Sequence, residues 1–388
     1  MTSLLTPLRL GFIPLMDAAI PIVAARKGFA ASRGIDLQLM RDTSWANIRD
    51  RLAIGHLDAA HLLAPMPVAA ALGLAPIKTP LIAPMALGTG GNAITFSSEL
   101  TEGISKAGVR AFPAEPVALG RALRAMIDAR TAKGVERLTF GVVHPYSAHN
   151  YELRYWLAAS GIDPDRDIEI AILPPPFMPD ALASQKIDGF CVGEPWNSVA
   201  RRRAGGTIVL TKSAIWRASP EKVLALREEW PNERPGDLAA LLQAMLDAAL
   251  WCEDIANRTE LVRVLSAPDL LDLPPEDLLP SLDGTLDGTG RFLTYAAGMA
   301  NMPWKSDALW FLGQMRRWGQ IGLGQGDPAR VRAAFRPDLL RAVLLARGIS
   351  APLVDDRPVA ADGEAGTVVP GTLGDVGLPR FGFFDGGS

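Results

Sequence analysis

The stretch Leu8-Arg-Leu-Gly-Phe-Ile13 decides how the amino-terminal part of the chain folds. A short apolar run of this kind predicts a buried strand. A helical pattern over Ala18–Ala31 follows at once and ends at a glycine-containing turn, and Asp36–Met40 is again strand-like. The order strand, helix, strand predicts an α/β arrangement from the start of the fold.

The same alternation continues along the chain, which has 388 residues. Further strands are expected at 59–63, 94–97, 138–143, 168–173, 189–192 and 207–210, and helices at 45–54, 117–132, 151–159 and 238–251. A chain of this length is too long for one compact core and suits two lobes. Because no low-complexity linker separates them, the lobes must be joined by crossing strands, for which 93–98 and 222–226 are the candidates. The predicted fold class is α/β with mainly parallel or mixed sheets.

The overall composition excludes several classes of protein. Hydrophobic residues make up 48% and charged residues 21% of the chain, which is typical of a soluble globular protein and argues against disorder. The formal net charge of −3 disfavours extensive binding to a nucleic-acid backbone. The two cysteines, Cys191 and Cys252, can form neither a disulfide framework nor a four-thiolate zinc site.

Enzyme motifs are missing from the sequence. It contains no HExxH, no GxxxxGK[ST] and no GxSxG, and its four histidines form no helical zinc pair. The glycine-rich run Gly88–Gly91 does not follow the strand–GxGxxG–helix order of a dinucleotide site. We therefore expect no metal, no cofactor and no catalytic residues.

Seven short motifs stand out against this background. They are Ser44-Trp-Ala-Asn-Ile-Arg-Asp50, His61-Leu-Leu-Ala-Pro-Met-Pro67, Gly90-Gly-Asn-Ala-Ile-Thr95, Ser147-Ala-His-Asn-Tyr-Glu-Leu-Arg-Tyr-Trp156, Gly193-Glu-Pro-Trp-Asn197, Ser219-Pro-Glu-Lys-Val-Leu224 and Pro303-Trp-Lys-Ser-Asp-Ala-Leu-Trp-Phe311. Together they resemble the nitrate/bicarbonate branch of the ABC-transporter solute-binding proteins, over residues 8 to about 325. The resemblance implies a periplasmic-binding-protein-like fold of type II, in which two α/β lobes are joined by two crossing strands and the ligand lies in the interlobe cleft.

The resemblance also implies a set of ligand-binding residues. In the nitrate-binding members these are a Trp, a Gln, a His and a Lys, which match Trp45, Asn92, His149 and Lys222; Asn92 departs from the pattern by being one methylene shorter than Gln. The bicarbonate branch carries an acidic residue at the lysine position to recruit a metal, which Lys222 cannot do. His61, Gly91 and Glu194 are expected as possible cleft residues.

Elementary chemistry agrees with an anion site at these residues. Nitrate and nitrite stay ionised at neutral pH, and burying a small anion without a partner is costly, so a fixed cation such as Lys222 is required. His149 and Asn92 can donate hydrogen bonds, and Trp45 offers an indole N–H and an apolar wall. Taken singly, each residue has an ordinary structural interpretation, and a lone lysine is most often exposed.

The sequence predicts the following segments: 1–96 as the first part of lobe I, 97–222 as lobe II, 223–349 as the return to lobe I with the C-terminal helices, and 350–388 as a tail rich in Pro and Gly. Phe381, Phe383 and Phe384 indicate that the end of this tail docks on the protein.

The leading functional hypothesis follows from the chain's first residues, which show no export signal and predict a cytoplasmic location. Within the resembling family, such members look like the nitrate/nitrite sensor of the NasS type, which holds an RNA-binding antiterminator response regulator of the NasT type inactive until the anion arrives. The alternative is the solute-binding component of an ABC transporter for nitrate or a related small oxyanion. A third interpretation is an enzyme on the same fold, like the thiamine-precursor synthases. In the sensor hypothesis the protein contacts neither nucleic acid nor membrane.

Overall fold

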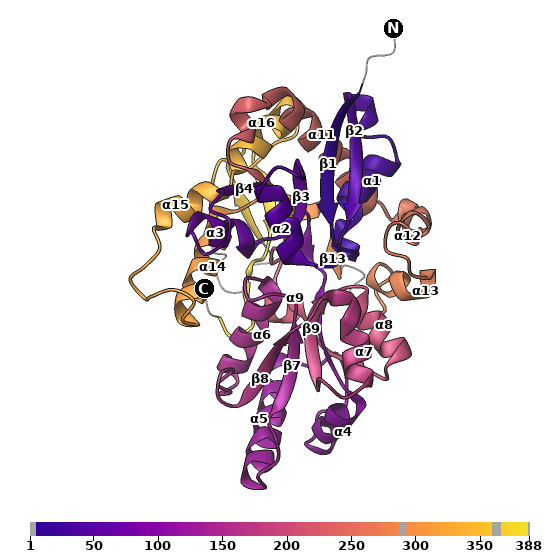
Figure 1. Ribbon diagram of the computed structural model, residues 1–388, viewed down its shortest axis with the longest axis vertical. Coiled ribbons are helices and arrows are strands. Elements are labelled where there is room, and N and C mark those ends of the chain that lie inside the picture. The colour runs from indigo at the N-terminus through magenta and orange to yellow at the C-terminus, as the bar shows by residue number, and fades with distance from the viewer. Residues whose placement is uncertain (1–4, 287–291, 359–365, 387–388) are drawn as a thin grey trace. The chain divides into compact units, whose positions relative to one another are not determined.

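The computed structural model describes residues 5–286, 292–358 and 366–386, which form two compact α/β units. Unit 1 comprises residues 1–89, 220–272 and 294–381, and unit 2 comprises 90–219, 273–293 and 382–388. Figure 1 shows the elements of both units. The chain therefore changes unit after residues 89, 219, 272, 293 and 381.

Unit 1 is built on a five-stranded sheet of order β2-β1-β3-β12-β4. Strand β1 pairs in parallel with β2 and β3, whereas β12 is antiparallel to β3 and to β4. The strands are β1 (Thr6–Phe12), β2 (Ile35–Arg41), β3 (Ala59–Leu63), β4 (Leu81–Ala86) and β12 (Lys222–Arg227). Every residue of β3 and β4 is buried, as expected for strands covered on both faces.

Helices cover the sheet of unit 1. Those nearest the amino terminus are η1 (Met16–Ala18), α1 (Ala19–Arg26), η2 (Ala31–Arg33), α2 (Trp45–Ala53) and α3 (Pro65–Ala71). The later ones are α10 (Trp230–Glu233), α11 (Pro235–Glu253), η4 (Ile255–Asn257), α12 (Arg258–Leu265), η6 (Ala297–Met299), α14 (Lys305–Arg317), α15 (Pro328–Ala334) and α16 (Pro337–Ala346). Helix α2 begins at its position because the Ser44 hydroxyl accepts a hydrogen bond from the Asn47 N–H at 3.3 Å.

Unit 2 repeats the topology of unit 1 in a sheet of order β10-β6-β9-β7-β8. Strand β7 is parallel to β8 and β9, and β6 is antiparallel to β9 and β10. The strands are β6 (Asn92–Phe96), β7 (Leu138–Val142), β8 (Ile168–Ile172), β9 (Gly189–Gly193) and β10 (Thr207–Thr211). The helices are α4 (Ser98–Lys106), α5 (Pro116–Ala132), α6 (Ala148–Ala159), η3 (Pro175–Phe177), α7 (Met178–Ala183), α8 (Trp196–Arg203), α9 (Lys212–Ile215), α13 (Pro275–Leu278) and η5 (Leu279–Ser281).

Strand β6 follows the change of unit after residue 89, and β12 follows the change after residue 219. These two strands occupy equivalent positions in the two sheets. Strand β6 lies between β9 and β10, and β12 lies between β3 and β4. The segments 93–98 and 222–226, which the sequence offered as crossings, fall in these two strands. The predicted boundary after residue 96 differs from the observed one, because β6 pairs entirely within unit 2 and the chain has already changed unit after residue 89.

The segment after residue 350 is more structured than the extended tail expected from the sequence. Strands β14 (Gly366–Val369) and β15 (Val376–Pro379) form an antiparallel pair in unit 1. Strand β16 (Gly382–Phe383) pairs with β11 (Trp216–Arg217) in unit 2. The predicted docking of the terminal phenylalanines is confirmed, since Phe381 packs against Trp304 and Phe383 stacks on Trp216 with ring centroids 4.8 Å apart. The remaining short strands, β5 (Thr89–Gly90) and β13 (Leu293–Thr294), pair with each other.

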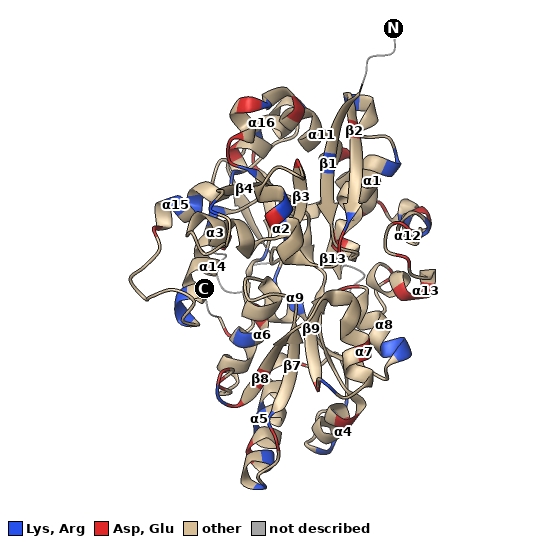
Figure 2. Ribbon diagram, in the orientation of Figure 1, with Lys and Arg blue, Asp and Glu red and all other residues tan. Residues whose placement is uncertain are grey.

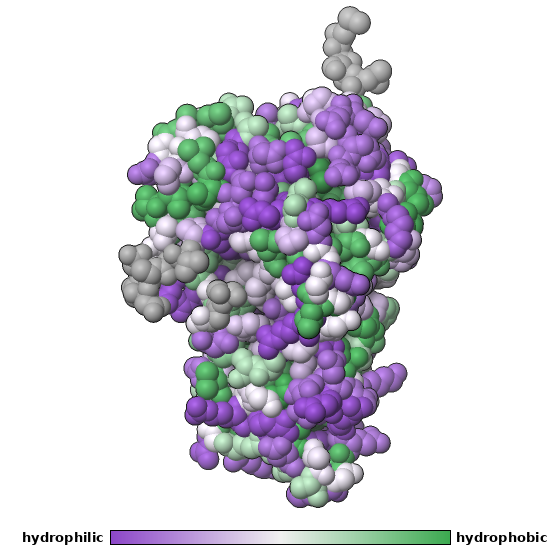
Figure 3. Space-filling view, turned by 90° about the vertical axis from the view of Figure 1, so that its left-hand side faces the viewer, coloured by the Kyte–Doolittle hydropathy of each residue, from purple (hydrophilic) through white to green (hydrophobic). Residues whose placement is uncertain are grey.

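Charged residues form local pairs on the surface of unit 2. Figure 2 shows the basic residues of α8 and the acidic residues of α13. Arg202 and Arg203 of α8 both bind the buried carboxylate of Asp277 in α13. On the face shown in Figure 3, hydrophilic and apolar residues are interspersed over the described surface. Among the helices within the described ranges, none combines the length and the hydropathy that crossing a membrane requires.

Candidate ligand-binding site

Lys222 is buried in unit 1 at the first residue of β12, with no exposed side-chain surface. Its ammonium group donates hydrogen bonds to Asp17 of η1 at 2.9 Å and to the neighbouring Glu221 at 2.8 Å. Burial by itself raises the pKa of Asp17, but Lys222 and a hydrogen bond from His61 outweigh it and hold this pKa below its usual range. Asp17 is therefore a carboxylate that pairs with the buried lysine.

His61 connects this ion pair to the interior of the sheet. Its Nε2 atom lies 2.8 Å from Asp17 Oδ1, and its Nδ1 atom lies 3.5 Å from the Ile13 backbone nitrogen. Burial lowers the pKa of His61 despite the nearby carboxylate. Since Nδ1 accepts an N–H, the proton of the neutral ring resides on Nε2 and is donated to Asp17. His61 thus fixes the direction in which Asp17 faces Lys222.

Trp45 completes the cluster of unit 1. Trp45 is the first residue of α2 and is 2% exposed. The centroid of its ring lies 5.3 Å from Lys222 Nζ and 5.4 Å from the centroid of the His61 ring. The indole Nε1 atom of Trp45 is buried and donates no hydrogen bond. A buried donor without a partner costs about 1–3 kcal/mol, so this atom requires an explanation.

Unit 2 holds a second buried ion pair, between Glu152 of α6 and Lys212 of α9. Glu152 Oε1 and Lys212 Nζ are 2.9 Å apart, and each side chain is 1% exposed. Asn92, the first residue of β6, directs its amide nitrogen to Glu152 Oε2 at 3.5 Å. The predicted ligand residue Asn92 is therefore positioned by this ion pair.

His149 lies in the first turn of α6, one turn before Glu152, and is fully buried. Ser147 caps the helix, because its hydroxyl accepts the Asn150 N–H at 3.1 Å and donates to the His144 carbonyl at 2.7 Å. The helix thus begins at Ala148, earlier than the predicted start at residue 151. This cap places His149 at the positive end of the helix dipole, where an anion is favoured.

Gly91 and Glu194 lie side by side in unit 2. The Glu194 N–H donates to the Gly91 carbonyl at 2.8 Å, next to the pairing of Asn92 with Gly193. Gly91 has a φ of +88°, and an added Cβ would approach the Leu293 side chain to 2.6 Å, so only glycine fits here. Burial raises the pKa of Glu194 to about 7.

The structure brings Trp45, Lys222 and His61 together in unit 1, and it places Asn92, His149, Gly91 and Glu194 in unit 2. The interpretation of Lys222 as a solvated lysine is wrong, because the side chain is completely buried. Sequence reasoning did not assign roles to Asp17, Glu152, Glu221 or Lys212. Glu152 and Glu221 lie inside two of the quoted motifs, and this position could have marked them as site residues. Asp17 and Lys212 lie outside the motifs, so the sequence contains no sign that they belong to the site.

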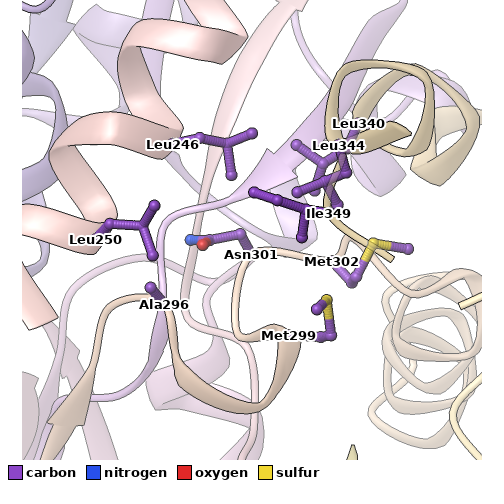
Figure 4. A pocket seen from close by; sticks show the side chains of 9 residues that line it. All are labelled: Leu246, Leu250, Ala296, Met299, Asn301, Met302, Leu340, Leu344 and Ile349. Carbon is purple, nitrogen blue, oxygen red and sulfur yellow. The ribbon is translucent and has the colours of Figure 1, made fainter. Parts of the chain in front are cut away.

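A separate apolar pocket lies in unit 1 between α11, η6 and α16 (Figure 4). Figure 4 shows leucines of α11 and α16 lining it together with Met299 and Met302. Its one polar lining residue, Asn301, donates to the Ala86 and Tyr295 carbonyls. None of the predicted ligand residues lines this pocket, and its walls do not suit an anion.

Comparisons with known proteins match this fold and these motifs. The NMT1-like family model matches residues 3–266. The nitrate/nitrite binding protein NrtA of Synechococcus elongatus is 35% identical over 370 residues, covering 90% of this chain and 80% of that protein. The crystal structure of the periplasmic nitrate-binding protein NrtA from Synechocystis superposes with a TM-score of 0.83 and 27% identity, covering 98% of this chain and 94% of that one.

A third relative is longer than this chain. The nitrate import ATP-binding protein NrtC of Synechocystis is 38% identical over 343 residues, which are 86% of this chain and 49% of that protein. This chain thus spans about half the length of that relative.

The two α/β units define a periplasmic-binding-protein-like fold, as the sequence predicts. The chain belongs to the NMT1-like family, among the solute-binding proteins of the nitrate/bicarbonate type. The NrtA relatives are named as binding proteins, in agreement with the prediction that the chain is not an enzyme. The relative NrtC is named for nitrate import, which favours the transport alternative over the sensor hypothesis.

Proposed function

We propose that this protein binds nitrate or nitrite as the solute-binding component of an ABC-type uptake system. The similarity to NrtA over most of both chains supports this ligand class. The similarity to NrtC, an ATP-binding protein of nitrate import, supports a transporter as the partner. Under this proposal the predicted ligand residues are Trp45 and Lys222 in unit 1, and Asn92 and His149 in unit 2.

The observation that carries the proposal is the unpartnered indole N–H of Trp45. It is buried next to the Lys222 ammonium group, so an acceptor that arrives there gains hydrogen bonds from two buried donors. A small anion with several oxygen acceptors has this chemistry. An acceptor oxygen that takes the indole N–H offsets the cost of burying this donor.

Lys222 supplies the fixed positive charge in this proposal. An ammonium group has three N–H donors, and two of them point to Asp17 and Glu221. The two carboxylates hold the ammonium group in one place, which leaves its third N–H for the ligand. Lys222 is therefore preorganised rather than flexible, as a site selective for a small anion requires.

The test is isothermal titration calorimetry of the purified chain with nitrate, nitrite and bicarbonate. We expect binding of nitrate or nitrite and weaker or absent binding of bicarbonate. A chain that binds none of the three anions would contradict the proposal.

Trp45→Phe tests the role of the indole directly, since it keeps an aromatic ring but removes the N–H. Because a hydrogen bond to a charged group is worth about 1.5–3 kcal/mol, the dissociation constant should rise roughly 10- to 100-fold. Trp230→Phe is the matched control: its indole N–H is also buried without a partner, but it lies in α10 outside the cluster. The control variant should bind the anion like the native protein, and an equal loss in both variants would remove Trp45 from the site.

The cytoplasmic location and the antiterminator partner remain predictions. Cell fractionation with an antibody against the chain decides the location. Co-purification with a permease and an ATPase would support the transport role, whereas an RNA-binding partner that dissociates on addition of nitrate would support the sensor instead.

A further inference from the structure

Glu194 comes directly after the last residue of β9 in unit 2, and it is only 1% exposed. Its Oε2 atom accepts the Ser198 N–H at 3.3 Å, in the first turn of α8. Its Oε1 atom is buried and has no hydrogen-bond partner.

The position of Glu194 links it to the proposed anion site. Gly193 pairs with Asn92 across the sheet, and the Glu194 N–H donates to the carbonyl of Gly91, the residue before Asn92. The carboxyl group therefore belongs to the same end of the β6–β9 pair as the predicted ligand residue. A negative charge at this end would oppose an incoming anion, whereas a protonated carboxyl would not.

We propose that Glu194 is a further residue that determines anion affinity, because its carboxyl group must hold a proton for the anion to bind. This inference rests on the proposed function. Burial raises the pKa of this carboxyl to about 7, against weaker opposing effects of the Ser198 side chain, the Ser198 N–H, Arg201 and the Asn197 side chain, so its proton is lost within the physiological range. Anion affinity should consequently fall as pH rises above neutrality.

Other charged or titratable groups lie on the elements packed against β9 and α8, and they must be separated from Glu194. On β9 there is Cys191, and on α7 there is Asp180. Helix α6 carries His149, Tyr151, Glu152, Arg154 and Tyr155, α8 carries Arg201, Arg202 and Arg203, and α13 carries Glu276 and Asp277. Glu152 is paired with Lys212, and Asp277 is paired with two arginines. His149 is the rival for a transition near neutral pH, because histidine ordinarily titrates there.

The experiment measures the nitrate dissociation constant by calorimetry at pH 6 and pH 8. For the native protein we expect a rise of about tenfold between these two values, because one proton is coupled to binding. Glu194→Gln keeps the shape and removes the charge, so its dissociation constant should be the same at both pH values. Asp188→Asn is the control, since Asp188 is a half-buried acid whose pKa is also raised by burial but which precedes β9 at its other end.

The outcomes separate this inference from the proposed function. A native protein that binds nitrate equally at both pH values overturns the role of Glu194 and leaves the proposed function intact. The same pH dependence in Glu194→Gln also overturns it and points to His149. A native protein that binds no anion at any pH overturns both. A further measurement uses the native protein alone, so it does not depend on whether a variant folds. At pH 7.5 the heats of nitrate binding in phosphate buffer and in Tris buffer must differ, because binding takes up a proton from the buffer. Identical heats in the two buffers contradict the proposal.

Discussion

The buried lysine of unit 1 shows how one residue depends on its partners. Lys222 has no exposed surface and binds two carboxylates, so its removal leaves Asp17 and Glu221 as buried charges without their cation. We expect Lys222→Ala to lower the free energy of unfolding by about 3–5 kcal/mol, as measured by urea denaturation. Lys186→Ala, which removes an exposed lysine, is the control and should change stability by less than about 0.5 kcal/mol. A fully stable Lys222→Ala protein would show that the ion pairs are not formed.

The protonation state of His61 provides a second prediction at the level of the residue. Its Nδ1 atom accepts the Ile13 N–H and burial lowers its pKa, so the ring should remain neutral at pH 6, with its proton on Nε2. Two-dimensional ¹⁵N NMR of the imidazole ring distinguishes this tautomer from the others and from the charged ring. The same residue in urea-unfolded protein is the reference and should be mostly charged at pH 6. Because the folded pKa is lowered, His61 contributes stability that is present above pH 6.5 and is lost as the pH falls towards the folded pKa.

At the scale of the element, the amino-terminal cap of α6 decides where His149 lies. Ser147 accepts the Asn150 N–H and donates to the His144 carbonyl, so it joins the helix to the preceding loop. Ser147→Ala should lower the free energy of unfolding by about 0.5–2 kcal/mol, and it should weaken anion binding if His149 is a ligand residue. Thermal unfolding and calorimetry measure the two effects. Ser98→Ala, at an exposed position of α4, should change neither.

The short strand β16 is the second element whose role can be tested. Phe383 stacks on Trp216 and lies 4.6 Å from the Tyr155 ring, while Asp385 accepts a hydrogen bond from the Tyr155 hydroxyl. Because the ring is only partly buried, Phe383→Ala should cost about 1–2 kcal/mol, below the value for a fully buried phenylalanine. Loss of the stacked ring should also change the fluorescence of Trp216. Leu373→Ala, which is 55% exposed, serves as the control and should leave both signals unchanged.

The sequence predicts best those strands and helices whose apolar residues recur in a regular pattern. The strand predicted at 189–192 is β9, and the helix predicted at 45–54 is α2, because both have an unambiguous apolar pattern. The helix predicted from residue 151 begins at Ala148 instead, since a serine cap, rather than the apolar pattern, sets its start. The β14–β15 pair was missed because its glycine- and proline-rich sequence lacks the alternation of a typical strand.

For the whole molecule, the family motifs identified residues but not their partners. Trp45 and Lys222 were named together and lie together. Asp17 and Lys212 escaped notice because a single charged residue is usually exposed, and only the folded chain shows that each is buried beside an opposite charge. Whether Asn92 and His149 contact the ligand stays a prediction.

The interleaving of the two units has a consequence for the order in which the protein forms on the ribosome. All five strands of the sheet in unit 2 lie within residues 92–211, so that sheet can assemble as soon as this stretch has emerged. The sheet of unit 1 has to wait, because β12 inserts between β3 and β4, which are synthesised much earlier. Until then the apolar edges of β3 and β4 stay unpaired, and they are the surfaces that a nascent-chain chaperone would have to shield.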